Sequence, residues 1–344
     1  MKKYELTHAR HDPAHCLAPG LFRSLKKGDY KRLKLDISYE FSEGEKLEFK
    51  AAEPLGVTEL RILQGLIAMA GPSGLLLTSE PKTESGQQLR LLLDTKFDAV
   101  TENAMVVKGS YRALAREIGY GDIEDARGIK EAIERLWGVS VIAEKNRKRR
   151  GYRLLADYAS DDADGRLYVA LNPRIAAAIL GEAQHCRIDM HEVRAIKGDS
   201  TRLIHQRLSG WIDTGKSGRI GIDTLCGYAW PNEATPNTMK QRRTRAKAAL
   251  AELAALGWNV NEYTRGKFEI SRPPTPRLTV PNPPANCTRR KSEKGPLSRF
   301  SKNLHMRAES QRHEWLVFRL PKTTNTRLRL WPSAIHRAVG KGGL

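Results

Sequence analysis

The sequence predicts an α+β fold in which one arrangement, two helices followed by a β-hairpin, occurs twice and precedes a proline-rich basic tail. Three observations predict it. Apolar residues recur with helical spacing in residues 124–137 and 236–256. Each stretch follows a short helix and precedes two β-rich runs around a basic turn. After residue 272, repeated prolines break any regular element. This order is typical of the winged helix-turn-helix, so we expect two such units in tandem.

Composition divides the chain into four parts. We expect an N-terminal arm (1–50), a first winged-helix domain (51–160), a second that is the main reading domain (161–272), and a disordered tail (273–344). The chain of 344 residues has a net charge of +20, and the tail contributes +12 of it, with 15 Lys and Arg against 3 Asp and Glu. A basic chain attracts polyanions such as nucleic acid, but localised basic elements are needed to support that interpretation.

Other global features exclude several classes of protein. No run approaches the roughly 18 apolar residues of a membrane span, and no apolar stretch follows the N-terminus as in a signal peptide. We therefore expect a soluble cytoplasmic protein that does not contact membranes. Four cysteines, at positions 16, 186, 226 and 287, lack zinc-finger spacing, so we interpret them as reduced thiols.

The first half of the chain supplies the first unit. Its expected elements are a helix over 57–70 ended by Gly71 and Pro72, strands at 75–77 and 89–93, a helix over 111–118 capped by Ser110, a helix over 124–137, and a hairpin of 139–143 and 152–155 around the basic turn 145–151. The 124–137 helix has a net charge of −1, which suits a DNA groove poorly. This unit either grips phosphates with its basic turn or serves in protein contacts, and the turn could also be an ordinary surface loop.

The second unit repeats the order. Its expected elements are a strand at 166–171, a helix over 173–180, a helix over 200–212 with Leu203, Ile204, Leu208 and Trp211 facing inward, a short helix over 224–230 capped by Asp223, a long helix over 236–256, and a hairpin of 258–263 and 268–271 around a turn at 264–267. Thr235 fits the cap of the long helix and Pro236 its first position. A possible strand at 316–320 lies in the tail.

The long helix has the strongest functional pattern. On a helical wheel, its buried face holds Met239, Ala246, Leu250, Leu253 and Gly257, and the opposite face holds Asn237, Lys240, Gln241, Thr244, Arg245 and Ala248. Asn and Gln side chains can pair with adenine, and Arg or Lys with guanine, in a major groove. A solvated basic face is the alternative, but the capped short helix before it and the basic hairpin after it favour DNA binding.

The candidate DNA-binding residues come from both units. They are Asn237, Lys240, Gln241, Arg242, Arg243, Thr244, Arg245, Lys247, Arg265 and Lys267 in the second unit, and Lys145, Arg147, Lys148, Arg149, Arg150, Ser110, Tyr111 and Arg112 in the first. The flanking cations at 242, 243 and 247 are expected to reach phosphates, which position a protein on DNA without reading its sequence.

Two motifs resemble catalytic or metal sites. Residues 210–217 match the phosphate-loop pattern, but they overlap a predicted helix and lead into a strand, so we interpret the match as chance. His8, His11, His15 and Cys16 could bind zinc, but Pro13 separates two of the histidines, and a polar arm with satisfied histidines is the simpler interpretation. We expect no enzymatic activity, no cofactor and no metal.

Four runs resemble the RepC replication initiators of broad-host-range IncQ-type plasmids. They are residues 8–25 (HARHDPAHCLAPGLFRSL), 60–66 (LRILQGL), 108–115 (KGSYRALA) and 223–228 (DTLCGY), and the resemblance extends over about residues 6–273. It implies a bacterial protein that binds directly repeated double-stranded sites (iterons) at a plasmid origin and promotes melting of adjacent A·T-rich DNA. It also implies cooperation with a plasmid-encoded hexameric helicase and a primase, and it allows a homodimer.

Other function classes stay open at this level. A transcriptional repressor, including an autorepressor, could use the same fold without initiating replication. An ATPase or a relaxase is the enzymatic alternative, although the chain lacks the pair of histidines flanking one apolar residue that a nicking enzyme would use to bind metal.

Overall fold

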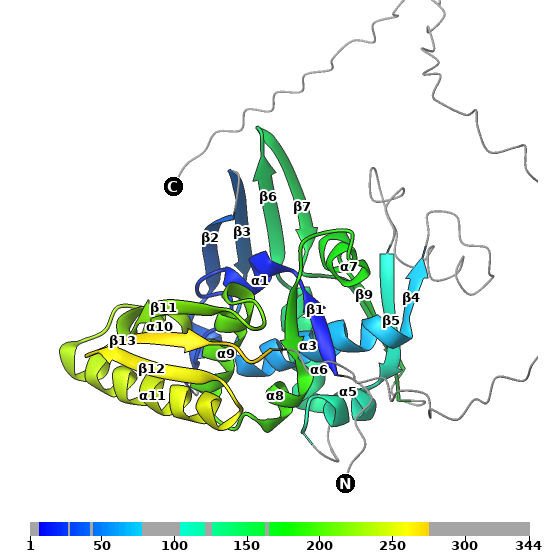
Figure 1. The fold of residues 1–344 in the computed structure, drawn as a ribbon. Helices are drawn as coiled ribbons and strands as arrows, with labels where there is room; N and C mark the ends of the chain where they lie inside the picture. The colour runs from blue at the N-terminus through cyan, green and yellow to red at the C-terminus, as the bar shows by residue number, and fades with distance from the viewer. Residues whose placement is uncertain are drawn as a thin grey trace, which may run out of the picture. The chain divides into compact units, whose positions relative to one another are not determined.

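The computed structural model describes residues 7–26, 28–41, 44–77, 104–120, 126–161 and 165–274. All of them belong to one compact unit, residues 1–278. They form a mixed α/β fold with antiparallel sheets (Figure 1). The predicted strands at 89–93 and 316–320, the start of the predicted helix at 124, and the tail from residue 275 lie outside the described residues. No helix in the described part of the chain is both long enough and apolar enough to cross a membrane.

Helix α3 (Val57–Ser73) is the centre of the first hydrophobic core. Its side chains Leu60, Leu63 and Ile67 are buried as their helical spacing predicts. The helix continues three residues beyond its predicted end at residue 70, to Ser73, because Pro72 removes one hydrogen bond near the helix end and the last turn still forms. The chain passes directly from α3 into β4 (Gly74–Leu77).

One four-stranded sheet joins the predicted N-terminal arm to the predicted first hairpin. Its order is β2-β3-β6-β7, with bounds of Leu35–Phe41, Glu45–Ala51, Ser140–Lys145 and Lys148–Arg153. Leu47 and Phe49 are fully buried, whereas Glu48 and Lys50 point to the other face. The boundary drawn at residue 50 therefore falls inside β3, because this period-two pattern adds the arm to the first core.

A second four-stranded sheet has the order β4-β5-β9-β8. Its further strands are β5 (Ala104–Ser110), β8 (Leu155–Asp161) and β9 (Arg166–Leu171). The boundary drawn at residue 160 falls inside β8. The β8–β9 hairpin pairs with β5 and buries Leu167, Val169 and Leu171 in the first core, so the predicted second domain gives its first strand to the first core.

Smaller elements complete the first core. They are β1 (His8–His11), α1 (Pro13–Leu17), α2 (Asp29–Arg32), α5 (Tyr111–Glu117), α6 (Arg127–Trp137), α7 (Pro173–Leu180), β10 (Cys186–Asp189) and α8 (Met190–Ala195). Strands β1 and β10 pair with each other and bring the N-terminal segment against the chain that leads into the second core.

The second core has the repeated order that the sequence predicts. It contains α9 (Asp199–Trp211), β11 (Ser217–Gly221), α10 (Ile222–Ala229), α11 (Pro236–Ala255), β12 (Asn259–Thr264) and β13 (Lys267–Ser271), and its sheet order is β11-β13-β12. Leu225, Leu250, Leu253 and Ile270 are buried at its centre.

Two expectations about this core are wrong in detail. Trp211, predicted to face inward, is 44% exposed, because it is the last residue of α9 and its ring lies against Gly218 at the sheet edge. Asp223 does not cap the short helix, because α10 begins one residue earlier, at Ile222. The Asp223 carboxylate instead accepts hydrogen bonds from Arg243.

A buried polar cluster joins the two cores around Glu192 of α8. His205 of α9 lies 2.7 Å from one carboxylate oxygen, and the indole N–H of Trp258 donates to the other at 3.1 Å. Arg272 follows β13, stacks near Trp258, and donates to the carbonyls of Ser209, at 2.9 Å, and of Arg187. Through these hydrogen bonds, α9 at the start of the second core and Arg272 at its end are both attached to the first core.

Replacing Glu192 with alanine should destabilise the fold by about 3 kcal/mol, because it leaves the buried Trp258 indole and His205 without their partner. Urea unfolding measures this loss. Hydrogen bonds from His205 and Trp258 hold the pKa of Glu192 below its usual 4.5 against the opposing effect of burial. The stabilisation is therefore complete above pH ~4.5 and is lost as the pH falls through the lower pKa of the folded protein.

The matched control is Glu233→Ala, at an exposed carboxylate before α11, which should leave stability unchanged. Equal stability of the Glu192→Ala protein and this control would show that the cluster does not hold the cores together.

Candidate nucleic-acid interface

Helix α11 begins as the sequence predicts. The Thr235 hydroxyl accepts the backbone N–H of Thr238 at 3.3 Å, and Pro236 occupies the first helical position. Ala246, Leu250 and Leu253 are buried. The orientation of the helix is thus set by its apolar stripe.

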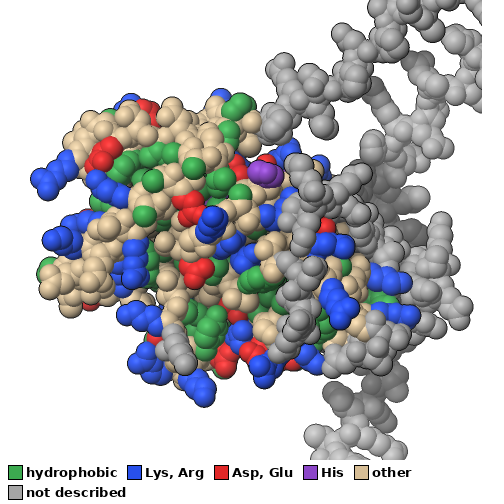
Figure 2. All heavy atoms as spheres, turned by 90° about the horizontal axis from the view of Figure 1, so that it is seen from below, with side chains coloured by type: hydrophobic (Ala, Val, Ile, Leu, Met, Phe, Trp, Pro, Cys, Tyr) green, Lys and Arg blue, Asp and Glu red, His purple; other side chains and the backbone are tan. Residues whose placement is uncertain are grey.

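The opposite face of α11 is exposed. It consists of Asn237, Lys240, Gln241, Thr244, Arg245 and Ala248. Lys240 and Arg245 form no ion pair within the described part of the chain. The Thr244 hydroxyl donates to the Lys240 carbonyl at 3.1 Å, so Thr244 presents a compact surface. Seen from below, Lys and Arg side chains are spread over the left-hand part of the surface, where Figure 1 places the second core (Figure 2).

Three flanking cations predicted to reach phosphates have partners within the protein. Arg242 donates to the Asn232 carbonyl at 2.6 Å, in the loop before α11. Arg243 forms a two-pronged ion pair with Asp223 at 2.6 and 2.8 Å, and Lys247 lies 3.0 Å from both carboxylate oxygens of Glu262 in β12. These contacts hold α11 against its loop, α10 and the hairpin. The sequence did not identify Asp223 or Glu262 as an ion-pair partner.

The second hairpin adds a small basic edge. Arg265 and Lys267 are exposed on either side of Gly266, whose φ of 73° suits glycine. Glu262 accepts the Gly266 N–H at 2.7 Å, and this bond, with Lys247, lowers the pKa of Glu262. Arg219 of β11 lies over the exposed Tyr263 ring, 5.4 Å from its centre. No sequence pattern pointed to Arg219.

The first hairpin projects its basic turn away from the core (Figure 1). Residues Lys145, Arg147, Lys148, Arg149 and Arg150 are exposed. Glu48 partly neutralises them: it lies 3.4 Å from Arg149 and is also paired with Lys46, at 3.0 Å, and Lys50, at 3.1 Å. The two lysines lower the pKa of Glu48 to about 2, so it is charged at neutral pH.

The helices of the first unit offer less to DNA. Ser110 caps α5, accepting the Ala113 N–H at 3.1 Å as predicted, and Arg112 is exposed. Tyr111, however, is only 6% exposed, so it packs in the core and is not available for DNA contact.

Helix α6 exposes mostly acids and glycine. Glu131 and Glu134 are exposed, whereas Arg135 turns inward to Glu59 at 2.7 Å. Tyr158 of β8 packs edge-on against Trp137 of the same helix. The exposed surface of α6 therefore carries few cations, as the net charge of −1 predicts, and Tyr158 covers part of the helix.

The phosphate-loop match does not have the geometry of a phosphate loop. Its first residues end α9, and Ser217 begins β11, so the order is helix, turn, strand rather than strand, loop, helix. The Gly215 N–H donates to the Arg272 carbonyl at 3.1 Å and the Lys216 N–H to Asp213 at 3.0 Å. The backbone donors that would hold phosphate are thus already used.

Among the N-terminal histidines, His11 and His15 are buried and His8 is partly exposed. Burial lowers the pKa of His11 to about 4 and of His15 to about 3, so both are neutral at pH 7. No group of three or more His, Cys, Asp or Glu side chains suited to a metal ion occurs among the described residues.

A family model for replication protein C (RepC) matches residues 3–274. The chain belongs to the RepC family. The resemblance seen in the sequence is thereby confirmed, and the matched region ends where the tail begins. No curated protein matches the sequence. Among solved structures, the chain is similar to the Pi initiator protein in complex with iteron DNA, with 13% identity, a TM-score of 0.43, and coverage of 78% of this chain and 97% of that one.

Replacing Arg147 with glycine should raise stability by about 1 kcal/mol and weaken DNA binding. Asn146 and Arg147 have φ of 52° and 63°, the left-handed backbone of a two-residue hairpin turn, which costs a residue with a side chain more than glycine. Thermal unfolding and a DNA titration measure the two effects. Arg147→Ala is the matched variant: it removes the charge but keeps the strain, so it should lose affinity without gaining stability. A glycine variant less stable than the alanine variant would contradict this account of the turn.

Proposed function

We propose that this RepC-family chain is a plasmid replication initiator. It binds directly repeated double-stranded sites at the origin, promotes melting of adjacent A·T-rich DNA, and helps to load a helicase carried on a separate chain. The observation that carries the proposal is the exposed face of α11, where Asn237, Gln241 and Arg245 lie opposite a buried apolar stripe. Amide and guanidinium groups on one helix face can read base edges in a major groove.

Each core is interpreted as a winged helix. In the second core, the order α9-β11-α10-α11-β12-β13 and the sheet β11-β13-β12 support this interpretation. In the first, α3, α5, α6 and the β6–β7 hairpin follow the same order. By their hydrophobic contacts, the units divide near residue 195, because Val193 packs in the first core and Ile196 in the second. Leu203 and Ala229 are the exceptions, since they lie beyond this point and pack in the first core.

The two units have unequal roles in this proposal. The second unit reads the repeat with α11, while Arg265 and Lys267 approach the neighbouring backbone. The first unit contributes its basic hairpin, because α6 exposes Glu131 and Glu134, which phosphates would repel. A hexameric helicase, a primase and a second copy of the chain are further partners implied by the family, and the protein supplies no catalysis itself.

Footprinting on DNA that carries the plasmid's own origin tests the function. An initiator protects several tandem repeats and makes the neighbouring A·T-rich DNA reactive to permanganate. Protection of a single palindrome without melting would contradict initiation and support the repressor alternative.

Gln241→Ala and Arg245→Ala should each weaken binding to the cognate repeat by roughly 10- to 100-fold and change binding to random DNA by far less, because each removes a base contact of about 1–3 kcal/mol. Competition titrations with both DNAs measure the ratio. Arg32→Ala, at an exposed arginine of α2, is the matched control. An equal loss on both DNAs would mean that these side chains touch only phosphate.

The triple variant Lys148→Ala, Arg149→Ala, Arg150→Ala should lower affinity for any duplex and reduce the slope of log affinity against log salt by about 2, since each phosphate contact contributes about 0.9. Three contacts would give more, but Glu48 already engages Arg149. Titrations at several salt concentrations measure the slope. A slope equal to that of the wild type would remove the first hairpin from the interface.

A further inference from the structure

Two cysteines distant in sequence meet in the first core. The Sγ atoms of Cys16, in α1, and Cys186, at the start of β10, lie 3.1 Å apart although 170 positions separate them. Both residues are buried. The β1–β10 pairing sets Cys186 opposite His11, and α1, capped by Asp12, brings Cys16 onto the same site. The third described cysteine, Cys226, lies in the second core.

The pair is held by polar contacts. The Gln206 amide donates to the Cys16 sulfur at 3.1 Å, and Cys186 donates to the His11 carbonyl at 3.4 Å. Burial raises the pKa of the Cys16 thiol, so Cys16 is protonated at neutral pH. Two packed thiols already in contact need only a small approach to form a bond.

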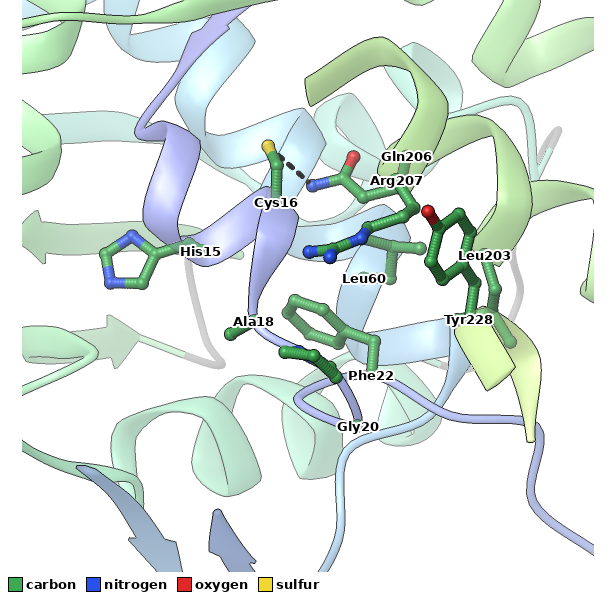
Figure 3. A pocket seen from close by; sticks show the side chains of 11 residues that line it. His15, Cys16, Ala18, Gly20, Phe22, Leu60, Leu203, Gln206, Arg207 and Tyr228 are labelled. Carbon is green, nitrogen blue, oxygen red and sulfur yellow. Dashed lines mark hydrogen bonds between the residues drawn. The ribbon is translucent and has the colours of Figure 1, made fainter. Parts of the chain in front are cut away.

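A small cavity borders one member of the pair. The cavity, of about 20 Å³, is lined by Cys16, Phe22, Arg207 and Tyr228 among others, and its lining does not include Cys186. That volume suits a molecule the size of water. Figure 3 shows Arg207 reaching from α9 into the space between Cys16 and Phe22.

Arg207 has unused hydrogen-bond donors at this cavity. Its guanidinium lies over the Tyr228 ring, 4.9 Å from the centre, and its Nε and Nη1 atoms are buried without a hydrogen-bond partner. Buried N–H groups without partners are uncommon in folded proteins. They could donate to the oxygen atoms of a small oxidant beside Cys16.

We propose that Cys16 and Cys186 form a peroxide-sensitive pair that closes to a disulfide. The Cys16 thiol first gives up its proton, and the thiolate attacks one oxygen of hydrogen peroxide. The O–O bond breaks, the leaving hydroxide takes up the proton, and a sulfenic acid and one water form. The Cys186 sulfur then attacks the Cys16 sulfur and releases the second water. In sum, two thiols and one peroxide give one disulfide and two waters.

The disulfide would link α1 covalently to β10, the strand that leads into α8 and the polar cluster around Glu192. A cross-link between residues so far apart restricts the unfolded chain strongly, so the oxidised protein should unfold at a higher temperature than the reduced one.

Mass spectrometry of the full chain tests the pair. The protein is treated with hydrogen peroxide, denatured, and alkylated with N-ethylmaleimide. The reduced protein takes up four maleimides, one for each cysteine. The oxidised protein should take up two, so after alkylation it should be lighter than the reduced protein by two maleimides and two hydrogen atoms. Peptide mapping should show residue 16 linked to residue 186.

Variants test separately the role of Cys186 in closing the disulfide and the role of Arg207 beside Cys16. Cys186→Ser should trap a sulfenic acid on Cys16 that dimedone labels, and Arg207→Met should slow disulfide formation several-fold. Cys226→Ser, the matched control, should form the disulfide at the rate of the wild type.

Four maleimides after peroxide treatment, or a link between another pair of cysteines, would overturn the proposal. So would a Cys16→Ser variant that still loses two thiols. Wild-type peptide mapping decides the matter if a serine variant does not fold.

Discussion

Burial of the apolar stripe of α11 is the constraint on which the candidate interface depends. Ala246, Leu250 and Leu253 pack in the second core, so the helix has one possible orientation about its axis. The polar positions 237, 241 and 245 consequently face solvent together. Their functional potential follows from this packing, because a face of amide and guanidinium groups becomes a reading surface only when the helix that carries it is fixed.

Polar contacts refine that orientation. The Arg243–Asp223 and Lys247–Glu262 pairs hold α11 against α10 and the hairpin, and Glu192 joins the second core to the first through His205 and Trp258. Cations expected to contact phosphates therefore also have partners within the protein. The exposed cations among the predicted DNA contacts lie on one helix face and two hairpin turns.

The sequence predicted the elements that local rules determine. Strand 166–171, helix 173–180, the Thr235 and Ser110 caps and the face of α11 all follow from period and capping chemistry. It did not predict contacts between distant segments. The pairing of β3 with β6, the burial of Tyr111 and the meeting of Cys16 with Cys186 depend on tertiary packing, which no single stretch encodes. The sequence also did not show the protein partners of Arg242, Arg243 and Lys247, since these partners lie 10–20 positions away.

The most direct test of the reading role of α11 is a crystal structure of the chain with a duplex that carries one repeat. The account predicts that α11 enters the major groove, with Gln241 and Arg245 within hydrogen-bond distance of base edges and Arg243 still paired with Asp223. A complex in which α11 faces solvent and α6 occupies the groove would contradict it.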